Sequence, residues 1–499
     1  MALVIGADSS TQSVKVEIRD AVTGVVLATA KASHPPTTPP RSEQDPNAWW
    51  VALTEAMNNA LSALSVDQRG DVVALSIGGQ QHGMVTLDVA DQPIRPAKLW
   101  NDTESSPEAD ALVAAQSAQW WASACGSVPV AAFTVTKLAW LKAHEPDNYA
   151  RLATVLLPHD EMTRRCVGRA VTDRGDASGT GYWSPETGGW ALDLLAQVDP
   201  QRNWLEVLPV VLGPRESAGT LTKSAAETFG LSESVLVGPG TGDNMAAALG
   251  IGLAPGDVVI SLGTSGTVYA VSDTSTADPT GCVAGFADAS GHFLPLVCTL
   301  NAMKVTDAVS RLLGADHQSF EDLVLAQEAG CGGLVLLPYL DGERTPNRPE
   351  ATGVLSGIRS DVSRSQLARA SVEGVVCGLL DGLDALTHAG VATGGRLFLI
   401  GGGSRSAAFR QVVADLAQRP VVVPDADEHV ATGACIQAAV VWAESKRQAT
   451  SSESNAAQFA NPFAELAAQW SLGGGSVTNP SVEGAVASAV RSAYATVRG

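Results

Sequence analysis

Apolar and polar positions along the chain form a strand–turn–strand pattern that recurs half a chain later. Residues 3–18, LVIGADSSTQSVKVEI, predict an apolar strand, a turn of small hydroxylated residues and an alternating strand. Residues 257–271, DVVISLGTSGTVYAV, follow the same plan, with Ser265 at the place of Thr11. One such hairpin is read as a plain β-turn, but two of them indicate a duplicated unit. Both turns expose backbone N–H groups and hydroxyls, which suits phosphate oxygens.

Strands alternate with helices in both halves of the chain. A helix predicted around residues 49–64 precedes a buried strand at 71–79. Residues 395–424 predict a strand, a glycine turn at 401–403, a helix and a second strand, which is a βαβ unit. Such a turn lets a nucleotide approach the backbone at a helix N-terminus, although tight packing selects glycine there as well. The alternation predicts an α/β fold and excludes an all-helical bundle or a β-sandwich.

The boundary between the halves is predicted near residues 232–240, GLSESVLVGPGTG. We therefore expect one domain over 1–235 and another over 236–499. Residues 449–476 are of low complexity and predict a surface loop. The last segment places valines at 482, 486, 490 and 497, which predicts an amphipathic helix.

Composition and charge narrow the class of protein. Hydrophobic residues make up 45% and charged residues 17% of 499, which permits large buried cores. The net charge of −20 disfavours nucleic acid and membranes as partners. The opening MALVIGADSS predicts a strand and not a signal peptide, and no apolar run is long enough to span a membrane. Seven scattered cysteines without a C-x-x-C pair indicate a cytoplasmic protein without a structural metal.

One carboxylate, Asp243, stands between a run of glycines and a run of alanines in VGPGTGDNMAAAL. From these residues alone Asp243 is as consistent with a helix N-cap as with a site residue, because aspartate is a preferred cap. Neither hairpin matches the G-x-x-x-x-G-K-[ST] pattern, and the first strand is not followed by G-x-G-x-x-G. An ordinary P-loop and a Rossmann dinucleotide site are therefore excluded.

Longer motifs resemble those of the FGGY carbohydrate kinases, and among them the xylulokinases. The stretch GVLSGIRSDVSRSQLARASVE is similar to the C-terminal signature of that family, and FTVTKLAWLKAH to the N-terminal one, although Ala132 departs from its usual first residue. GGQQHG, LWND, DASGTGYW and LPYLDGERTPNRP follow in the family's order. The resemblance runs from about residue 3 to residue 440.

The resemblance implies two actin-like, ribonuclease-H-like α/β domains that flank a catalytic cleft. It implies ATP-dependent phosphorylation of D-xylulose to D-xylulose 5-phosphate, with Mg²⁺ as cofactor and a homodimer as the family's usual assembly. The alternatives are another FGGY substrate, such as ribulose, gluconate, glycerol or an alditol, and a non-catalytic actin-like nucleotide-binding regulator.

The same resemblance assigns roles to single residues. Asp243 is expected to be the base that takes the proton of the sugar hydroxyl, and Asp8 to hold Mg²⁺ through water. Ser10 replaces the family's glycine after Asp8, and Gln81 stands where methionine is frequent. Arg344 is expected to hold its loop by a charge pair. The expected sugar-binding residues are Gln81, His82, Trp100, Asn101, Asp102 and Asn244; the expected nucleotide-binding residues are Thr11, Gln12, Ser13, Lys15, Gly263, Thr264, Ser265, Gly402, Gly403 and Ser406.

Overall fold

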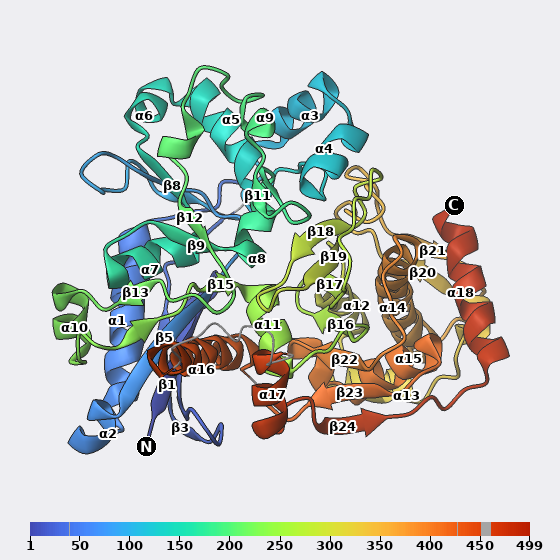
Figure 1. Ribbon diagram of the computed structural model, residues 1–499. Coiled ribbons are helices and arrows are strands. Elements are labelled where there is room, and N and C mark those ends of the chain that lie inside the picture. The colour runs from blue at the N-terminus through green and yellow to red at the C-terminus, as the bar shows by residue number, and fades with distance from the viewer. Residues whose placement is uncertain (39, 427, 451–460) are drawn as a thin grey trace.

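Two mixed seven-stranded sheets, one in each half of the chain, form the frame of the molecule (Figure 1). The computed structural model describes residues 1–38, 40–426, 428–450 and 461–499. In the first sheet the strands run in the order β13-β14-β5-β1-β2-β3, and β15 pairs with β5. Their bounds are β1 Leu3–Ser9, β2 Ser13–Asp20, β3 Val26–Ser33, β5 Val72–Gly79, β13 Gly219–Thr220, β14 Leu236–Val237 and β15 Thr241–Gly242.

The second sheet repeats this plan in the order β18-β19-β17-β16-β22-β23-β24. An antiparallel hairpin, β16–β17, pairs with a third antiparallel strand on one side and with parallel β22 on the other, as β1–β2 does with β3 and β5. The predicted duplication is confirmed. The strands are β16 Val258–Leu262, β17 Gly266–Ala270, β18 Ala284–Ala287, β19 Phe293–Thr299, β22 Leu397–Ile400, β23 Val421–Pro424 and β24 Gly475–Thr478.

Equivalent helices cover the two sheets. Helix α1 (Pro46–Ser62) begins at the N-cap Asp45 and buries Trp49, Leu53 and Met57 at helical spacing against the first sheet. Helix α14 (Arg364–His388) packs against β17 and β19 of the second sheet. The expected βαβ unit is observed as β22, the short 3₁₀ turn η4 (Gly402–Arg405), α15 (Ala407–Ala417) and β23.

Two helices join the halves. Helix α11 (Asp243–Ile251) and helix α16 (His429–Thr450) lie against each other, and α16 also packs on β1 and β5 of the first sheet (Figure 1). Glycines permit this approach: a Cβ at Gly433 would stand 1.8 Å from the carbonyl of Ala246, and one at Gly250 would stand 1.9 Å from that of His429. Helix α16 thus comes after the predicted boundary at 235/236 in the sequence but packs on the first sheet. The boundary itself stays a prediction.

The remaining elements decorate the two sheets. Most of those in the first half lie between β5 and β14, and α3 to α6 gather at the top of Figure 1. In the first half they are β4 Glu43–Gln44, α2 Val66–Gly70, β6 Val85–Leu87, β7 Ala97–Lys98, α3 Ser106–Ala115, α4 Ala118–Cys125, α5 Thr134–His144, α6 Pro146–Arg151, β8 Thr154–Leu156, α7 Pro158–Val167, β9 Val171–Asp173, α8 Arg174–Ala177, η1 Ser178–Thr180, β10 Trp183–Ser184, β11 Gly189–Trp190, α9 Leu192–Leu195, η2 Trp204–Glu206, β12 Val210–Leu212 and α10 Lys223–Phe229. In the second half they are α12 Met303–Leu313, α13 His317–Leu325, η3 Cys331–Gly333, β20 Val335–Leu337 and β21 Val354–Ser356.

The chain after residue 460 corrects the predicted surface loop over 449–476. Residues 461–476 include helix α17 (Pro462–Gln469) and the start of β24, which adds an edge strand to the second sheet. Buried Phe463 and Trp470 hold this segment against the core. The rest of the predicted loop, 451–460, lies outside the described residues. The last helix, α18 (Gly484–Arg498), begins two residues after Val482.

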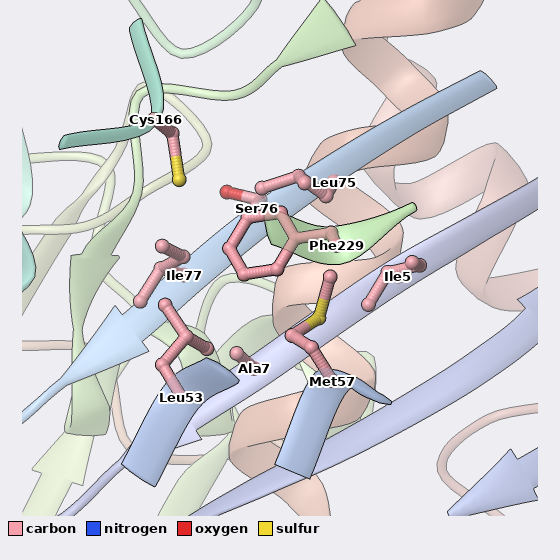
Figure 2. A pocket seen from close by; sticks show the side chains of 9 residues that line it. All are labelled: Ile5, Ala7, Leu53, Met57, Leu75, Ser76, Ile77, Cys166 and Phe229. Carbon is pink, nitrogen blue, oxygen red and sulfur yellow. The ribbon is translucent and has the colours of Figure 1, made fainter. Parts of the chain in front are cut away.

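The core of the first half is closely packed. Figure 2 shows a small void near β1 and β5, about 10 Å³ and lined by side chains such as Leu53, Met57 and Phe229. A volume of that size holds at most about one water, and apolar walls offer it no partners. This void is therefore a packing defect and not a ligand site. No helix in the described ranges combines the length and apolarity that a membrane crossing needs.

Candidate active site

Three turns of the first half meet at one edge of its sheet. In β5, Gly78 is paired with Asp8 of β1 on one side and with Thr241 of β15 on the other. Parallel neighbours end at the same edge, so the turns after these strands are adjacent. The register therefore brings the hydroxylated turn at 10–12, the GGQQHG turn and the start of helix α11 together.

Asp243 is the first residue of helix α11, and Gly242 occupies the N-cap position. Asp243 is thus not the N-cap residue, and its Oδ1 accepts from the backbone N–H of Asn244 at 2.7 Å and from its side-chain amide at 2.8 Å. The side chain lines a cavity of about 270 Å³ between the halves. Burial, followed by the negative charges of Asp8 and Asp176, raises the pKa of Asp243 to about 7. A carboxyl group with that pKa can accept a proton near neutral pH.

Gln81 and Asn244 join Asp243 in the wall of this cavity. The Asn244 side-chain amide donates to Gln81 Oε1 at 2.8 Å, so one amide group bridges Gln81 and the carboxylate. Gln81 Nε2 is buried and makes no hydrogen bond within the described residues. Gly242 makes room for this arrangement, because a Cβ there would stand 2.6 Å from Gln81 Cγ. An unpaired buried donor beside a candidate base suits a hydroxyl or carbonyl oxygen of a ligand.

His82 also lines the cavity, from a turn in which its φ is +64°. Its ring packs against Phe133 and Phe286, with ring centroids 5.1 Å and 5.4 Å away. Gly179 has no room for a side chain here, since a Cβ would lie 2.3 Å from the imidazole. Burial, helped by the positive charges of Lys137 and Arg344, holds the pKa of His82 well below its usual value. The imidazole is therefore neutral, and its buried Nδ1 lies on the side of the ring that faces Gly179.

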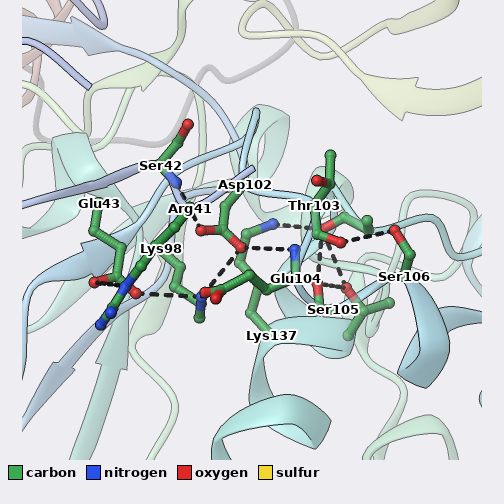
Figure 3. A network of polar contacts seen from close by, with 12 residues as sticks. Arg41, Ser42, Glu43, Lys98, Asp102, Thr103, Glu104, Ser105, Ser106 and Lys137 are labelled. Carbon is green, nitrogen blue, oxygen red and sulfur yellow. Dashed lines mark hydrogen bonds and ion pairs between the residues drawn. The ribbon is translucent and has the colours of Figure 1, made fainter. Parts of the chain in front are cut away.

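Of the LWND residues, Trp100 lines the cavity. Its indole N–H donates to Thr11 Oγ1 at 3.0 Å, which links the expected sugar pocket to the first hydroxylated turn. Asn101 and Asp102 are not among the lining residues. Asp102 is fully buried and accepts from the backbone N–H of Ser42 at 2.9 Å (Figure 3). Its carboxylate is thus occupied by the scaffold, and it shapes the pocket through the turn that carries Trp100.

Figure 3 shows the polar network to which Asp102 belongs. Oxygens of Glu43, Asp102 and Glu104 lie within 4.8 Å of one another, a spacing that would suit a metal ion. The buried Lys98 ammonium already stands among them, 3.1 Å from Asp102 and 3.2 Å from Glu43. Neighbouring Lys137 is also buried and donates to the Ala131 carbonyl at 2.7 Å. The network is therefore an ion-paired support and not a metal site.

The first hydroxylated turn presents a carboxylate that fits Mg²⁺. Asp8 is buried, and its Oδ1 makes no hydrogen bond within the described ranges. Burial raises its pKa to about 7, against the opposing charge of Lys15. Magnesium takes one or two carboxylates together with phosphates and waters, so this free oxygen suits it. Lys15 Nζ lies 4.0 Å from Asp8 and 2.7 Å from Glu428, so it is already ion-paired.

The other residues of this turn differ in exposure. Thr11 is partly exposed and donates to Gln80 Oε1 at 3.2 Å. Gln12 is exposed, whereas Ser13 is buried. Of these three residues, Thr11 and Gln12 can therefore be reached by a ligand without rearrangement.

The corresponding turns of the second half also share one edge. Ser261 of β16 is paired with Ile400 of β22, so the turn at 263–265 and the glycines at 401–403 are neighbours. Gly263 and Ser265 line the same cavity as Asp243, and Thr264 between them is exposed. The structure thus places one candidate phosphate turn of the second half at the same cavity as the candidate base.

Three nucleotide candidates lie outside that cavity, after β22. A Cβ at Gly402 would meet nothing within 4 Å, which leaves its backbone open to a ligand. At Gly403 a Cβ would stand 2.7 Å from Leu262, so this glycine serves packing. Ser406 caps helix α15 and donates to Glu321 at 2.6 Å. Of the three, Gly402 is the one whose backbone a ligand could approach closely, and its role in nucleotide binding stays a prediction.

Comparison with known proteins identifies the fold that carries this site. The model of the N-terminal domain of the FGGY family of carbohydrate kinases matches residues 3–250, and that of the C-terminal domain matches 258–442. The chain belongs to the FGGY family of carbohydrate kinases. The predicted fold of two actin-like α/β domains is thereby confirmed.

Several relatives of this FGGY kinase span nearly all of it. Xylulose kinase of Streptomyces coelicolor is 48% identical over 440 residues, which cover 88% of this chain and 87% of that protein. The solved xylulose kinase from Bifidobacterium adolescentis has a TM-score of 0.85 at 39% identity and covers 100% of this chain and 99% of its own. Gluconate kinase from Lactobacillus acidophilus reaches a TM-score of 0.87 at 21% identity, with coverage of 99% and 96%. Its likeness concerns the fold alone.

A buried cluster in this FGGY kinase supports the base, and the sequence did not predict it. The imidazole of His159 lies 3.3 Å from Asp160, 3.3 Å from Asp176 and 3.5 Å from Asp173. Although burial opposes it, the charges of these carboxylates raise the pKa of His159 well above its usual value. Asp173 also accepts from Thr241 Oγ1 at 2.7 Å, two residues before the base. The cluster therefore supports the turn that carries Asp243. In the sequence, acidic residues within apolar segments were the one sign of this cluster.

The expectation for Arg344 is wrong. Within the described residues its guanidinium makes no ion pair, and it lines the cavity instead. The loop is held by Glu343, whose carboxylate accepts the backbone N–H of Leu300 at 2.6 Å and that of Arg344 at 2.8 Å. The charge that fixes the loop is therefore the neighbouring carboxylate.

Proposed function

We propose that this chain phosphorylates D-xylulose with ATP to give D-xylulose 5-phosphate. The observation that carries the proposal is the position of Asp243. A carboxyl group with a raised pKa lines a cavity between two duplicated halves, opposite a turn suited to phosphate. Relatives such as the Streptomyces coelicolor protein, a xylulose kinase at 48% identity, support the choice of sugar.

In this proposal the sugar lies against Gln81, His82, Trp100 and Asn244. The unpaired Gln81 Nε2 and the neutral His82 imidazole bond its oxygens, and the indole of Trp100 covers it. Asn244 holds the Asp243 carboxylate by two hydrogen bonds, which fixes the orientation of the base. Positioning of this kind is the main contribution of a kinase to phosphoryl transfer.

The nucleotide lies across both halves. The backbone at Thr11 and Gln12 and that at Gly263 to Ser265 face its phosphates, and Gly402 its nucleoside. Mg²⁺ bound near Asp8 would neutralise charge on the triphosphate. Asp243 takes the proton of the sugar's terminal hydroxyl as the oxygen attacks the γ-phosphorus and ADP leaves. The positive end of helix α11 stabilises charge on the transferring group. Oligomeric state and cellular location stay predictions.

A coupled ADP-release assay over a panel of sugars tests this function. The panel contains D-xylulose, D-ribulose, gluconate, glycerol and two alditols, each at several concentrations. We expect the highest kcat/KM for D-xylulose. A higher value for another sugar would overturn the substrate but leave the kinase activity standing. ATP binding without turnover of any sugar would favour the nucleotide-binding regulator.

A further inference from the structure

The loop that carries Arg344 is fixed on both sides of that residue. The buried Glu343 carboxylate accepts from the backbone of Leu300, and Thr345 Oγ1 donates to the carbonyl of Cys298 at 2.8 Å. Both contacts reach the end of strand β19. Residue 344 therefore has a defined backbone position, with its neighbours turned into the fold.

Its side chain has no such anchor. Arg344 is the only Arg or Lys among the cavity-lining residues in the described part of the chain. The guanidinium makes no side-chain hydrogen bond or ion pair with a described residue, whereas most arginines of the chain hold a carboxylate or a carbonyl. A cation held at a cavity wall without a partner suits an anionic ligand.

The cavity needs a cation for phosphoryl transfer. Asp243 lines it and Asp8 lies near, and a triphosphate adds further negative charge. The other cations nearby are engaged: Lys15 pairs with Glu428, and Lys137 donates to the carbonyl of Ala131. In phosphoryl transfer, charge spreads over the equatorial oxygens of the transferred group, where an arginine is effective.

We propose that the Arg344 guanidinium contacts the γ-phosphoryl group of ATP and stabilises its charge during transfer. The inference rests on the proposed function and adds a catalytic residue to it. In the step itself a bond forms between the sugar oxygen and the γ-phosphorus, and the bond from that phosphorus to the β,γ-bridging oxygen breaks. The proton of the sugar hydroxyl moves to Asp243. Arg344 forms and breaks no covalent bond in this step and acts through its charge alone.

The variants R344A and R344K, with R348A as control, test the proposal. Arg348 lies on the same loop but outside the cavity, where it donates to the carbonyl of Arg498 at 2.6 Å. We expect R344A to lower kcat by about 10²–10³-fold, the usual effect of removing one donor to the reacting group, with KM for the sugar unchanged within about threefold. R344K should retain intermediate activity, and R348A should keep that of the wild type.

Chemical rescue separates a direct contact from a structural role. Millimolar guanidinium ion should restore part of the kcat of R344A and leave the wild type unaffected. Melting temperatures of all variants control for folding. A kcat within about threefold of the wild type, or a rise in sugar KM alone, would overturn the proposal. An equal loss in R348A would also overturn it.

The test of Arg344 does not depend on which sugar is the substrate. Each variant is measured with the sugar that the wild type phosphorylates fastest, so a preference for another sugar leaves the test intact. If the wild type phosphorylates no sugar, the proposed function fails, and slow hydrolysis of ATP by water becomes the readout. Unchanged hydrolysis in R344A would then refute the contact with the γ-phosphoryl group.

Discussion

The substitution D243N should lower turnover by orders of magnitude and at the same time stabilise the fold. Asparagine keeps the shape of the side chain and an oxygen that can accept from Asn244, but it cannot take a proton. Loss of a general base costs about 10²–10⁴-fold in kcat. The gain in stability follows because the wild-type carboxylate is charged in a partly buried, poorly solvated place, near the charge of Asp8.

The raised pKa sets the size and the sign of this gain. Asp243 shifts from its ordinary value of 3.8 to about 7, so its ionisation costs the folded state about 4 kcal/mol above pH 7. A carboxyl group whose pKa is raised on folding exerts no penalty below the unfolded value. The penalty grows as pH rises from 3.8 and is complete above about 7. D243N removes it at every pH.

Urea denaturation of wild type and D243N near pH 5 and near pH 8 measures this difference. The gap in free energy of unfolding should widen by about 2–3 kcal/mol between the two conditions. The control D110N changes an exposed carboxylate on helix α3 and should show no such widening. A gap for D243N that is independent of pH would refute the burial of a charged base. Near-normal turnover would place the base elsewhere.

Three further outcomes can be checked on the same protein. The kcat/KM of the wild type should rise with pH and reach half its maximum near 7, as Asp243 loses its proton; an acidic limb below pH 5 would contradict this. H159Q leaves three buried carboxylates without their cation and should lower the free energy of unfolding by about 3–5 kcal/mol. Because the pKa of His159 is raised on folding, its contribution to stability is complete below about pH 6.5 and decreases as pH rises through the folded value. Urea denaturation near pH 6 should therefore show the largest decrease in the free energy of unfolding of H159Q. An equal decrease at pH 9 would refute the ion pairing. G433A would put a methyl group 1.8 Å from a carbonyl of helix α11 and should cost at least about 1–3 kcal/mol, whereas G70A, with nothing within 4 Å, should leave the melting temperature unchanged.

Much of the frame could be predicted because it depends on local pattern. The period of apolar residues and the turn residues predicted two hairpins, at 3–18 and 257–271, and a βαβ unit at 395–424. The structure confirms all three. The loop predicted over 449–476 failed for the opposite reason. Helix α17 and strand β24 are short, and they are held by packing of Phe463 and Trp470 on other parts of the chain.

Some features of the candidate site could likewise be predicted from local sequence, whereas others depend on tertiary packing. The sequence singled out Asp243 by its G-D-N context, and the glycines around it indicated that a ligand approaches the backbone closely. Both signals could be recognised because they lie within a few residues of each other. Asp102 and Arg344 look alike in sequence, as charged residues in polar turns. Their side chains nevertheless lie in opposite settings, one in a buried ion network and one at the cavity wall. The segments that pack around each side chain decide between the two settings, and local sequence does not encode that packing.

The sequence by itself determined the duplicated strand–turn–strand units and the identity of the acid between them. These properties follow from the period of hydrophobic positions and from the conformational freedom of glycine, which act over short distances. Only the tertiary structure decided which charges remain unpaired. The pairing of Lys15 with Glu428 and the gathering of carboxylates around His159 join residues distant in the chain, and the raised pKa of Asp243 exists only once both halves exclude water around it.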